Sequence, residues 1–167
     1  MQASPQMSSS ENDAQEEALN SSKFLTFVIG DACYGLDIAH VTEIIGLQKI
    51  TAMPDVPTYI KGVINLRGNV IPVMDVRSRF GLMNRDYDDR TCIIVIHVES
   101  TSIGLVVDTV SEVLDIDHAN IQPPPSMGSD TSSCYISGLG KVDTDVKVLL
   151  DARRLLNLSD IDLSTLQ

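Results

Sequence analysis

Apolar runs of strand length recur along most of this chain and predict a protein built mainly of β-strands. Residues 24–29 form the first run, and a Gly-Asp pair closes it with a turn. Residues 34–38 alternate less cleanly, and residues 41–45 are rich in β-branched side chains. Two prolines then interrupt residues 51–57. We therefore expect three short strands followed by a break in regular structure.

A hairpin and a short helix are predicted next. Residues 60–66 and 70–74 flank Arg67-Gly68-Asn69, a sequence that fits a hairpin tip with positive φ angles. Asp75 is placed to cap a helix over residues 76–80, and glycine follows that helix. Asp151 occupies the same place before residues 152–156. These helices close the units without defining their fold.

The chain carries an internal repeat. Residues 34–45 reappear 69 positions later, with Gly, Leu, Val and Glu identical in register. Residues 59–63 and 73–77 reappear 76 positions later, so the second copy holds seven extra residues between its two blocks. Such a repeat indicates two like units that pack together, and any feature found in one copy alone becomes a candidate for function.

Each copy reads as a five-strand unit that curls into a small barrel, since closure removes exposed strand edges. The predicted boundaries are residues 23–84 and 91–158, joined by a solvated linker at 85–90. Residues 1–22 read as a disordered tail whose removal should leave stability and partner binding nearly unchanged, and 159–167 as a C-terminal tail or short helix. The two units share an apolar seam, and the pattern leaves open which strands or terminal helices cross to the other barrel.

Charge and composition favour protein partners. The net charge is −11, and the few basic residues are not gathered into a stripe, which disfavours binding to nucleic acid. The chain has no Trp, and aromatic residues make up only 4%, which weakens that class further. Cys33, Cys92 and Cys134 lack the paired spacing of a disulfide framework or zinc site, so reduced thiols are expected.

No constellation of residues for catalysis is visible. His40, His97 and His118 are scattered, and neither a nucleophile elbow nor a phosphate-binding loop is present. We therefore expect no enzymatic activity, no cofactor and no metal. No apolar run reaches the roughly 20 residues that span a bilayer, and no secretory signal opens the chain. The expected location is cytoplasmic, without direct membrane insertion.

One difference between the copies stands out. The first copy has Asn65-Leu66-Arg67-Gly68-Asn69 where the second has Lys-Val-Asp-Thr-Asp at residues 141–145. Because the repeat builds its hairpin there without arginine, Arg67 is a candidate functional residue. The alternative is a solvated hairpin charge.

Several of these segments resemble the CheW family of chemotaxis coupling proteins. They are residues 27–29, 34–38, 41–44, 59–68 and 104–108, and the likeness extends from about 23 to 157. It implies a mainly β fold of two tandem five-stranded Src-homology-3-like barrels, related by internal duplication and carrying short capping helices. It also implies a non-catalytic adaptor that is monomeric when free. Such adaptors link the cytoplasmic tip of methyl-accepting chemoreceptors to the regulatory domain of the histidine kinase CheA, in membrane-associated arrays.

The resemblance also implies where partners bind. It places seven residues near the receptor and kinase surfaces: Ile38, Val41, Glu43, Asn65, Arg67, Gly104 and Val110. Glu43 and Arg67 are expected to pair. Gln122 and Met127 stand where family members often carry a basic residue and an aromatic one, in a region implied in a second kinase contact that closes array rings. Two alternatives stay open: a coupling protein of a chemosensory array outside chemotaxis, and a small-barrel enzyme or nucleic-acid binder.

Overall fold

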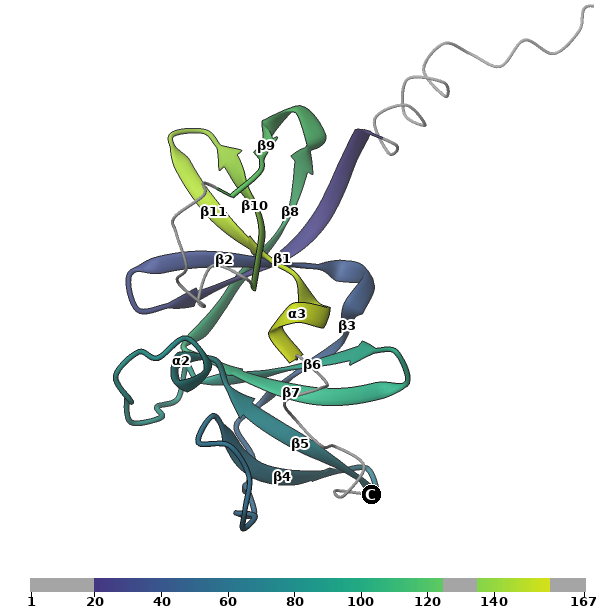
Figure 1. Cartoon of the computed structure of the whole chain (residues 1–167), viewed down its shortest axis with the longest axis vertical. Helices are drawn as coiled ribbons and strands as arrows, with labels where there is room; N and C mark the ends of the chain where they lie inside the picture. Colours follow the sequence, from purple (N-terminus) through teal and green to yellow (C-terminus); the bar gives the residue numbers. More distant parts are fainter. Residues whose placement is uncertain (1–19, 125–134, 157–167) are drawn as a thin grey trace, which may run out of the picture.

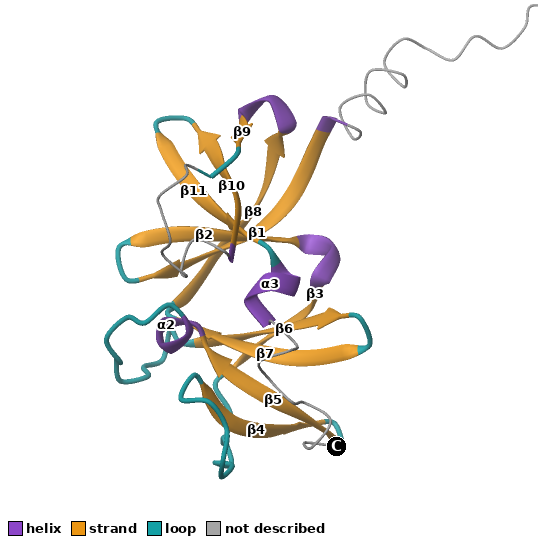
Figure 2. Cartoon of the chain, viewed as in Figure 1, coloured by secondary structure: helices purple, strands orange, loops and turns teal. Residues whose placement is uncertain are grey.

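The computed structural model describes residues 20–124 and 135–156, and their strands form two barrels with both helices between them (Figures 1 and 2). The first half contains β1 (Ser21–Ile29), β2 (Ala32–Asp37), β3 (Val41–Gly46), β4 (Ile60–Leu66), β5 (Asn69–Asp75) and helix α2 (Val76–Arg79). The second half contains β6 (Cys92–Val98), β7 (Thr101–Val107), β8 (Thr109–Asp117), β9 (Ile121–Gln122), β10 (Ile136–Val142), β11 (Asp145–Leu150) and helix α3 (Ala152–Leu156). One-turn 3-10 helices precede β3 and β9.

The two halves exchange their first hairpins. One sheet has the order β8-β1-β2-β11-β10-β9 and the other β3-β6-β7-β5-β4. The hairpin β1–β2 therefore lies in the sheet of the second half, and the hairpin β6–β7 lies in that of the first. Neither sheet is one consecutive stretch of chain, so the crossing that the sequence left open involves two strands from each side.

Each exchanged hairpin joins its sheet through a parallel pair of strands. Gly35 on β2 lies opposite Leu149 on β11, and Gly104 on β7 lies opposite Val73 on β5. A Cβ at Gly35 would approach a Leu149 methyl to 2.9 Å, and one at Gly104 would approach Ile93 to 2.8 Å. Because 69 positions separate the two glycines, the repeat preserves this close approach in both barrels.

In each barrel, a short segment of backbone passes close to a second glycine and pairs with the strand that carries it. Thr51 exchanges two backbone hydrogen bonds with Val63, at 2.8 and 2.9 Å, beside Gly62. A Cβ at Gly62, whose φ is +146°, would lie 2.0 Å from the Thr51 carbonyl oxygen. In the other barrel, Gly138 leaves the same kind of room for the backbone of β9.

The largest apolar cluster belongs to both barrels. It takes side chains from both sheets and both helices, among them Phe27, Leu36, Met74, Ile94 and Leu155, all completely buried. A smaller cluster fills each barrel separately. The predicted apolar seam is thus the main core, and it buries more surface than either small barrel could bury alone.

The helices follow the repeat closely. Asp75 accepts a hydrogen bond from the Ser78 amide, and Asp151 accepts one from the Arg154 amide, as the capping prediction requires. The backbone amide of each capping aspartate donates to a tyrosine carbonyl 16 residues earlier, Tyr59 or Tyr135.

One side chain at the junction breaks this symmetry. The Arg79 guanidinium lies between the two tyrosine rings, with its central carbon 4.4 Å from the centre of Tyr59 and 4.6 Å from that of Tyr135. Its Nε donates to the carbonyl of Leu155, which holds the equivalent position in the second copy. Arg79 therefore binds the two repeats to each other.

Two boundaries differ from the sequence prediction. Strand β1 begins at Ser21, where Ser21 and Ser22 pair with Asp117 and Ile116, so the predicted tail at 1–22 includes two strand residues. Pairing with β8 orders these polar residues although they have no apolar face of their own. The linker at 85–90, expected to be solvated, makes hydrogen bonds to both halves, from Tyr87 to Asp75 and from Arg85 to Asp108.

Candidate protein-docking site

Glu43 and Arg67 form a two-pronged ion pair at the mouth of the barrel that contains β3, β4 and β5. The two guanidinium nitrogens donate to the two carboxylate oxygens at 2.9 and 2.7 Å. The Arg67 side chain is 73% exposed and the Glu43 side chain 22%. Glu43 lies opposite Val95, a buried residue of this barrel, so its carboxylate is half-buried while the guanidinium it holds faces solvent.

The hairpin between β4 and β5 sets the position of Arg67. Arg67 and Gly68 have φ angles of 53° and 87°, and Leu66 pairs with Asn69 across this two-residue turn. The Asn65 side chain accepts a hydrogen bond from the Gly68 amide at 2.9 Å and so fixes the turn. The positive φ angles predicted at the tip are confirmed, and Asn65 acts here by holding the turn that carries Arg67.

The two barrels carry different charges at this place: an acidic residue paired with a cation in one, and two acidic residues in the other. The hydrogen bonds that Arg67 donates to Glu43, together with the negative charge of Glu43, raise the pKa of the Arg67 guanidinium. In the other barrel, the same places hold Glu112 and Asp143, and Asp143 has a φ of 55°, close to that of Arg67. The fold therefore accepts an acidic residue at this turn, and the arginine is a property of one barrel.

Apolar side chains on the two edge strands face the shared core and reach solvent. On β3, Val41 lies opposite Ile96 and Ile44 lies opposite Ile94. On β8, Val110 lies opposite Phe27 and Val113 lies opposite Leu25. All four of the opposing residues belong to the shared core. Ile44 is 45% exposed and Val113 is 50% exposed.

We call five apolar residues beside the shared core the edge-strand surface, of which four lie on β3 and β8 and one lies in the 3-10 helix just before β3: Ile38, Val41, Ile44, Val110 and Val113. Ile38, Val41 and Val110 were expected at a partner surface, and the structure packs all three against the shared core at intermediate exposure. Ile44 and Val113 were not singled out from the sequence. Their positions in the repeat, 69 residues apart within apolar strands, are the signal that could have found them.

The remaining predicted site residues lie elsewhere. Gly104 is buried in β7 against Ile93, so it shapes the sheet and presents no side chain to a partner. Gln122 is exposed on β9 and pairs with Leu139. Met127 lies outside the described residues. The structure thus brings Glu43, Asn65 and Arg67 together, places Gly104 one strand beyond the Val95 that faces Glu43, and puts Gln122 in the other sheet.

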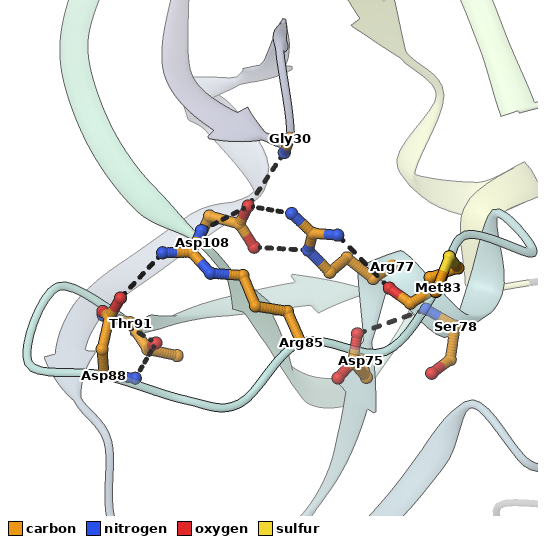
Figure 3. A network of polar contacts seen from close by, with 9 residues as sticks. All are labelled: Gly30, Asp75, Arg77, Ser78, Met83, Arg85, Asp88, Thr91 and Asp108. Carbon is orange, nitrogen blue, oxygen red and sulfur yellow. Dashed lines mark hydrogen bonds and ion pairs between the residues drawn. The ribbon is translucent and has the colours of Figure 1, made fainter.

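A second polar cluster lies where the two halves meet, and sequence reasoning did not find it (Figure 3). Arg77 donates to both oxygens of Asp108, at 2.8 and 2.6 Å, and the Gly30 amide donates to the same carboxylate at 2.8 Å. Arg85 adds a contact of 3.1 Å. These hydrogen bonds, that from Arg77 foremost, lower the pKa of Asp108 to about 2.

Within the described residues, no group of three or more metal-ligating side chains is present. No helix in the same part of the chain is long and apolar enough to cross a membrane. Two Src-homology-3-like barrels that carry an exposed ion pair and exposed apolar side chains define a class of mainly β protein with surfaces suited to contact with other proteins.

Comparison with known proteins identifies the family. The model of the CheW-like domain matches residues 23–160, and the chain belongs to this family. A chemotaxis protein CheW of Klebsiella aerogenes is 36% identical over 84% of this chain and 85% of its own length. Protein FrzA of Myxococcus xanthus is 30% identical over 83% of this chain and 84% of its own.

A solved structure agrees with the fold. The crystal structure of the scaffolding protein TtCheW from Thermoanaerobacter tengcongensis superposes with a TM-score of 0.75 at 36% identity, covering 80% of this chain and 91% of that one. The predicted fold class is thereby confirmed.

Proposed function

We propose that this protein is a non-catalytic adaptor that couples methyl-accepting chemoreceptors to the histidine kinase CheA in chemotaxis signalling. The observation that carries the proposal is the Glu43–Arg67 pair, held rigidly at the mouth of one barrel and replaced by two acidic residues in the other. Family membership supports the same role, since the matched relatives include chemotaxis proteins and a scaffolding protein.

The two exposed features suit two partners. A barrel mouth with a fixed guanidinium offers a planar donor for a carboxylate on a partner. The edge-strand surface offers apolar contact beside the seam, which suits an amphipathic helix such as the receptor tip. We assign the barrel mouth to the kinase regulatory domain and the edge-strand surface to the receptor. The free protein is a cytoplasmic monomer that these contacts recruit to membrane-associated arrays.

Charge reversal at Arg67 tests the proposal. In the Arg67→Glu variant a second carboxylate faces Glu43, and the partner meets repulsion where it met a donor. We expect receptor-controlled kinase activity in reconstituted arrays to fall at least about tenfold, because like charges facing each other at an interface are strongly unfavourable. The melting curve by circular dichroism should stay near that of the wild type, because Asp143 occupies the equivalent turn.

The matched control is Arg153→Glu. Arg153 also forms an exposed ion pair, with Glu99 at 3.3 Å, but lies outside both proposed surfaces. This variant should couple receptors normally. If Arg67→Glu melts and couples like the control, Arg67 is only a solvated hairpin charge and the assignment of the site is wrong. A pull-down with the kinase regulatory domain tests the adaptor role itself.

A further inference from the structure

Residues 81–91 are the stretch of backbone that joins two halves, each of which supplies strands to the other's sheet. The first half, β1 to α2, lends the hairpin β1–β2 to the other sheet, and the second half, β6 to α3, returns the hairpin β6–β7. Four strand pairs join the halves: β1 with β8, β2 with β11, β3 with β6, and β5 with β7. None of these four pairs includes a residue of the link.

The same strand pairs are therefore available between two copies of the chain. The first half of one copy can complete its barrels with the second half of another, and the reverse, without any new interface. A segment of this length reaches about 36 Å when extended, far enough to pass from one pair of barrels to a neighbouring pair. What separates the closed monomer from the exchanged dimer is thus the conformation of residues 81–91.

In this structure the link is folded back on the half that precedes it. The Leu82 amide donates to the Arg77 carbonyl at 2.9 Å, and Arg77 donates to the Met83 carbonyl at 3.2 Å. The Tyr87 hydroxyl donates to Asp75 at 2.6 Å. Arg85 reaches across to Asp108 of the second half, where Figure 3 shows it beside Arg77. Extending the link would break most of these bonds.

The ion pair between Arg77 and Asp108 behaves differently. It joins the first half to the second and lies outside the link, so it forms equally well within one chain or between two. It stabilises the closed monomer and the exchanged dimer equally, so it favours neither. The contacts that favour the monomer are those of Arg85 and Tyr87.

We propose that residues 81–91 are a hinge that keeps this protein monomeric when docked, and that its release lets two copies exchange halves into a dimer. The partner is a second copy of the same chain, recognised by the strand pairs already present in the monomer. The docked hinge favours closure within one chain, because extending residues 81–91 would pull Tyr87 away from Asp75 and Arg85 away from Asp108 of the same chain.

The first experiment loosens the hinge and measures mass. The double variant Arg85→Ala, Tyr87→Phe is unfolded in denaturant, refolded at high protein concentration and analysed by size-exclusion chromatography with light scattering. We expect the ratio of dimer to monomer to rise about tenfold or more over wild type, since a hydrogen bond to a charged group is worth about that factor. Deletion of residues 84–89 should make the dimer predominant. The control Arg153→Ala should match wild type.

The second experiment shows exchange directly and uses full-length chains. Leu36→Asp disables the first half and Leu155→Asp disables the second, because both leucines are completely buried. In the loosened background, neither variant should give the native circular dichroism spectrum alone. Refolded together, they should recover about half of the native signal, since exchange pairs two intact halves.

The proposal is overturned if the loosened and shortened variants refold as monomers at every concentration and the mixed variants recover no native signal. A dimer that forms without such recovery also contradicts it, because that dimer would arise from an ordinary surface contact.

Discussion

At the residue scale, the position of Arg67 in the candidate site depends on a few residues around it. Arg67 has a positive φ that an arginine seldom adopts, and it does so because Gly68 follows it and Asn65 holds the turn. Glu43 then fixes the guanidinium from a strand 24 residues earlier. Sequence comparison of the two copies could find Arg67. It could not find Arg77 or Asp108, whose partners lie in the other half of the chain.

Asp108 should make stability depend on acid pH. Its pKa lies near 2 in the folded protein against an ordinary value of 3.8, so its contribution is present above about pH 4 and is lost as the pH falls toward 2. Asp108→Asn should lower the free energy of unfolding by about 1 to 2 kcal/mol at pH 7, and the deficit should shrink between about pH 5 and pH 2. Urea unfolding at each pH measures it.

The control for this prediction is Asp115→Asn. Asp115 belongs to an exposed pair with Lys23, at 3.5 Å. Its variant should follow the wild type across the whole pH range. If the Asp108→Asn variant is less stable than the wild type by the same free energy at every pH, the negative charge of Asp108 does not stabilise the fold.

At the scale of elements, the local pattern predicted the strands, hairpins and caps correctly because each depends on neighbouring residues. The hairpin at Arg67-Gly68 and the aspartate caps at residues 75 and 151 are of this kind. The partner of each strand was not predictable in the same way. The strand β1 is apolar enough to pair with several other strands. Its pairing with β8 depends on how all the strands pack together in the folded protein.

Gly62 should be intolerant of any side chain. Gly62→Ala places a Cβ 2.0 Å from the Thr51 carbonyl oxygen and forces a φ of +146° on alanine. We expect a loss of about 2 to 4 kcal/mol or more in the free energy of unfolding. Gly46→Ala is the control, because nothing lies within 4 Å of its Cβ position. Equal melting temperatures for the two variants would contradict the close passage of the backbone beside Gly62.

The start of β1 gives a second test at this scale. Truncation that removes residues 1–22 takes Ser21 and Ser22 out of their pairing with β8, whereas truncation of residues 1–19 leaves β1 complete. The shorter truncation should melt like the full chain. The longer one should melt lower, by the loss of two paired residues. If both melt alike, the first two residues of β1 add nothing to the sheet.

At the scale of the whole molecule, the repeat predicted two alike barrels, and its offsets agree with the sheet orders. The exchange of hairpins could not be predicted from the sequence. A barrel built from one half of the chain and a barrel built from both halves would use the same strands with the same apolar faces. The predicted division at 23–84 and 91–158 follows the repeat, while the sheets cut across it.

A cut in the hinge should therefore produce two pieces that need each other. Residues 1–86 and 87–167, expressed separately, should each lack a cooperative melt, because each barrel then lacks two strands. Mixed in equal amounts, they should regain the melt and co-elute as one species on size-exclusion chromatography. Cooperative folding of either piece alone would show that a barrel closes without the exchanged hairpin.

Arg79, which lies between two tyrosine rings at the junction, shows what a repeat within one chain allows that two identical chains do not. Two identical units related by a two-fold axis would place either two arginines or two leucines at the positions of Arg79 and Leu155. Two guanidinium groups there would repel each other, and two leucines would leave the rings without a cation. Fusion of the genes removes this restriction, since each position can then mutate alone. A single chain that holds both repeats can thus place at this junction an asymmetric contact that two identical chains could not form.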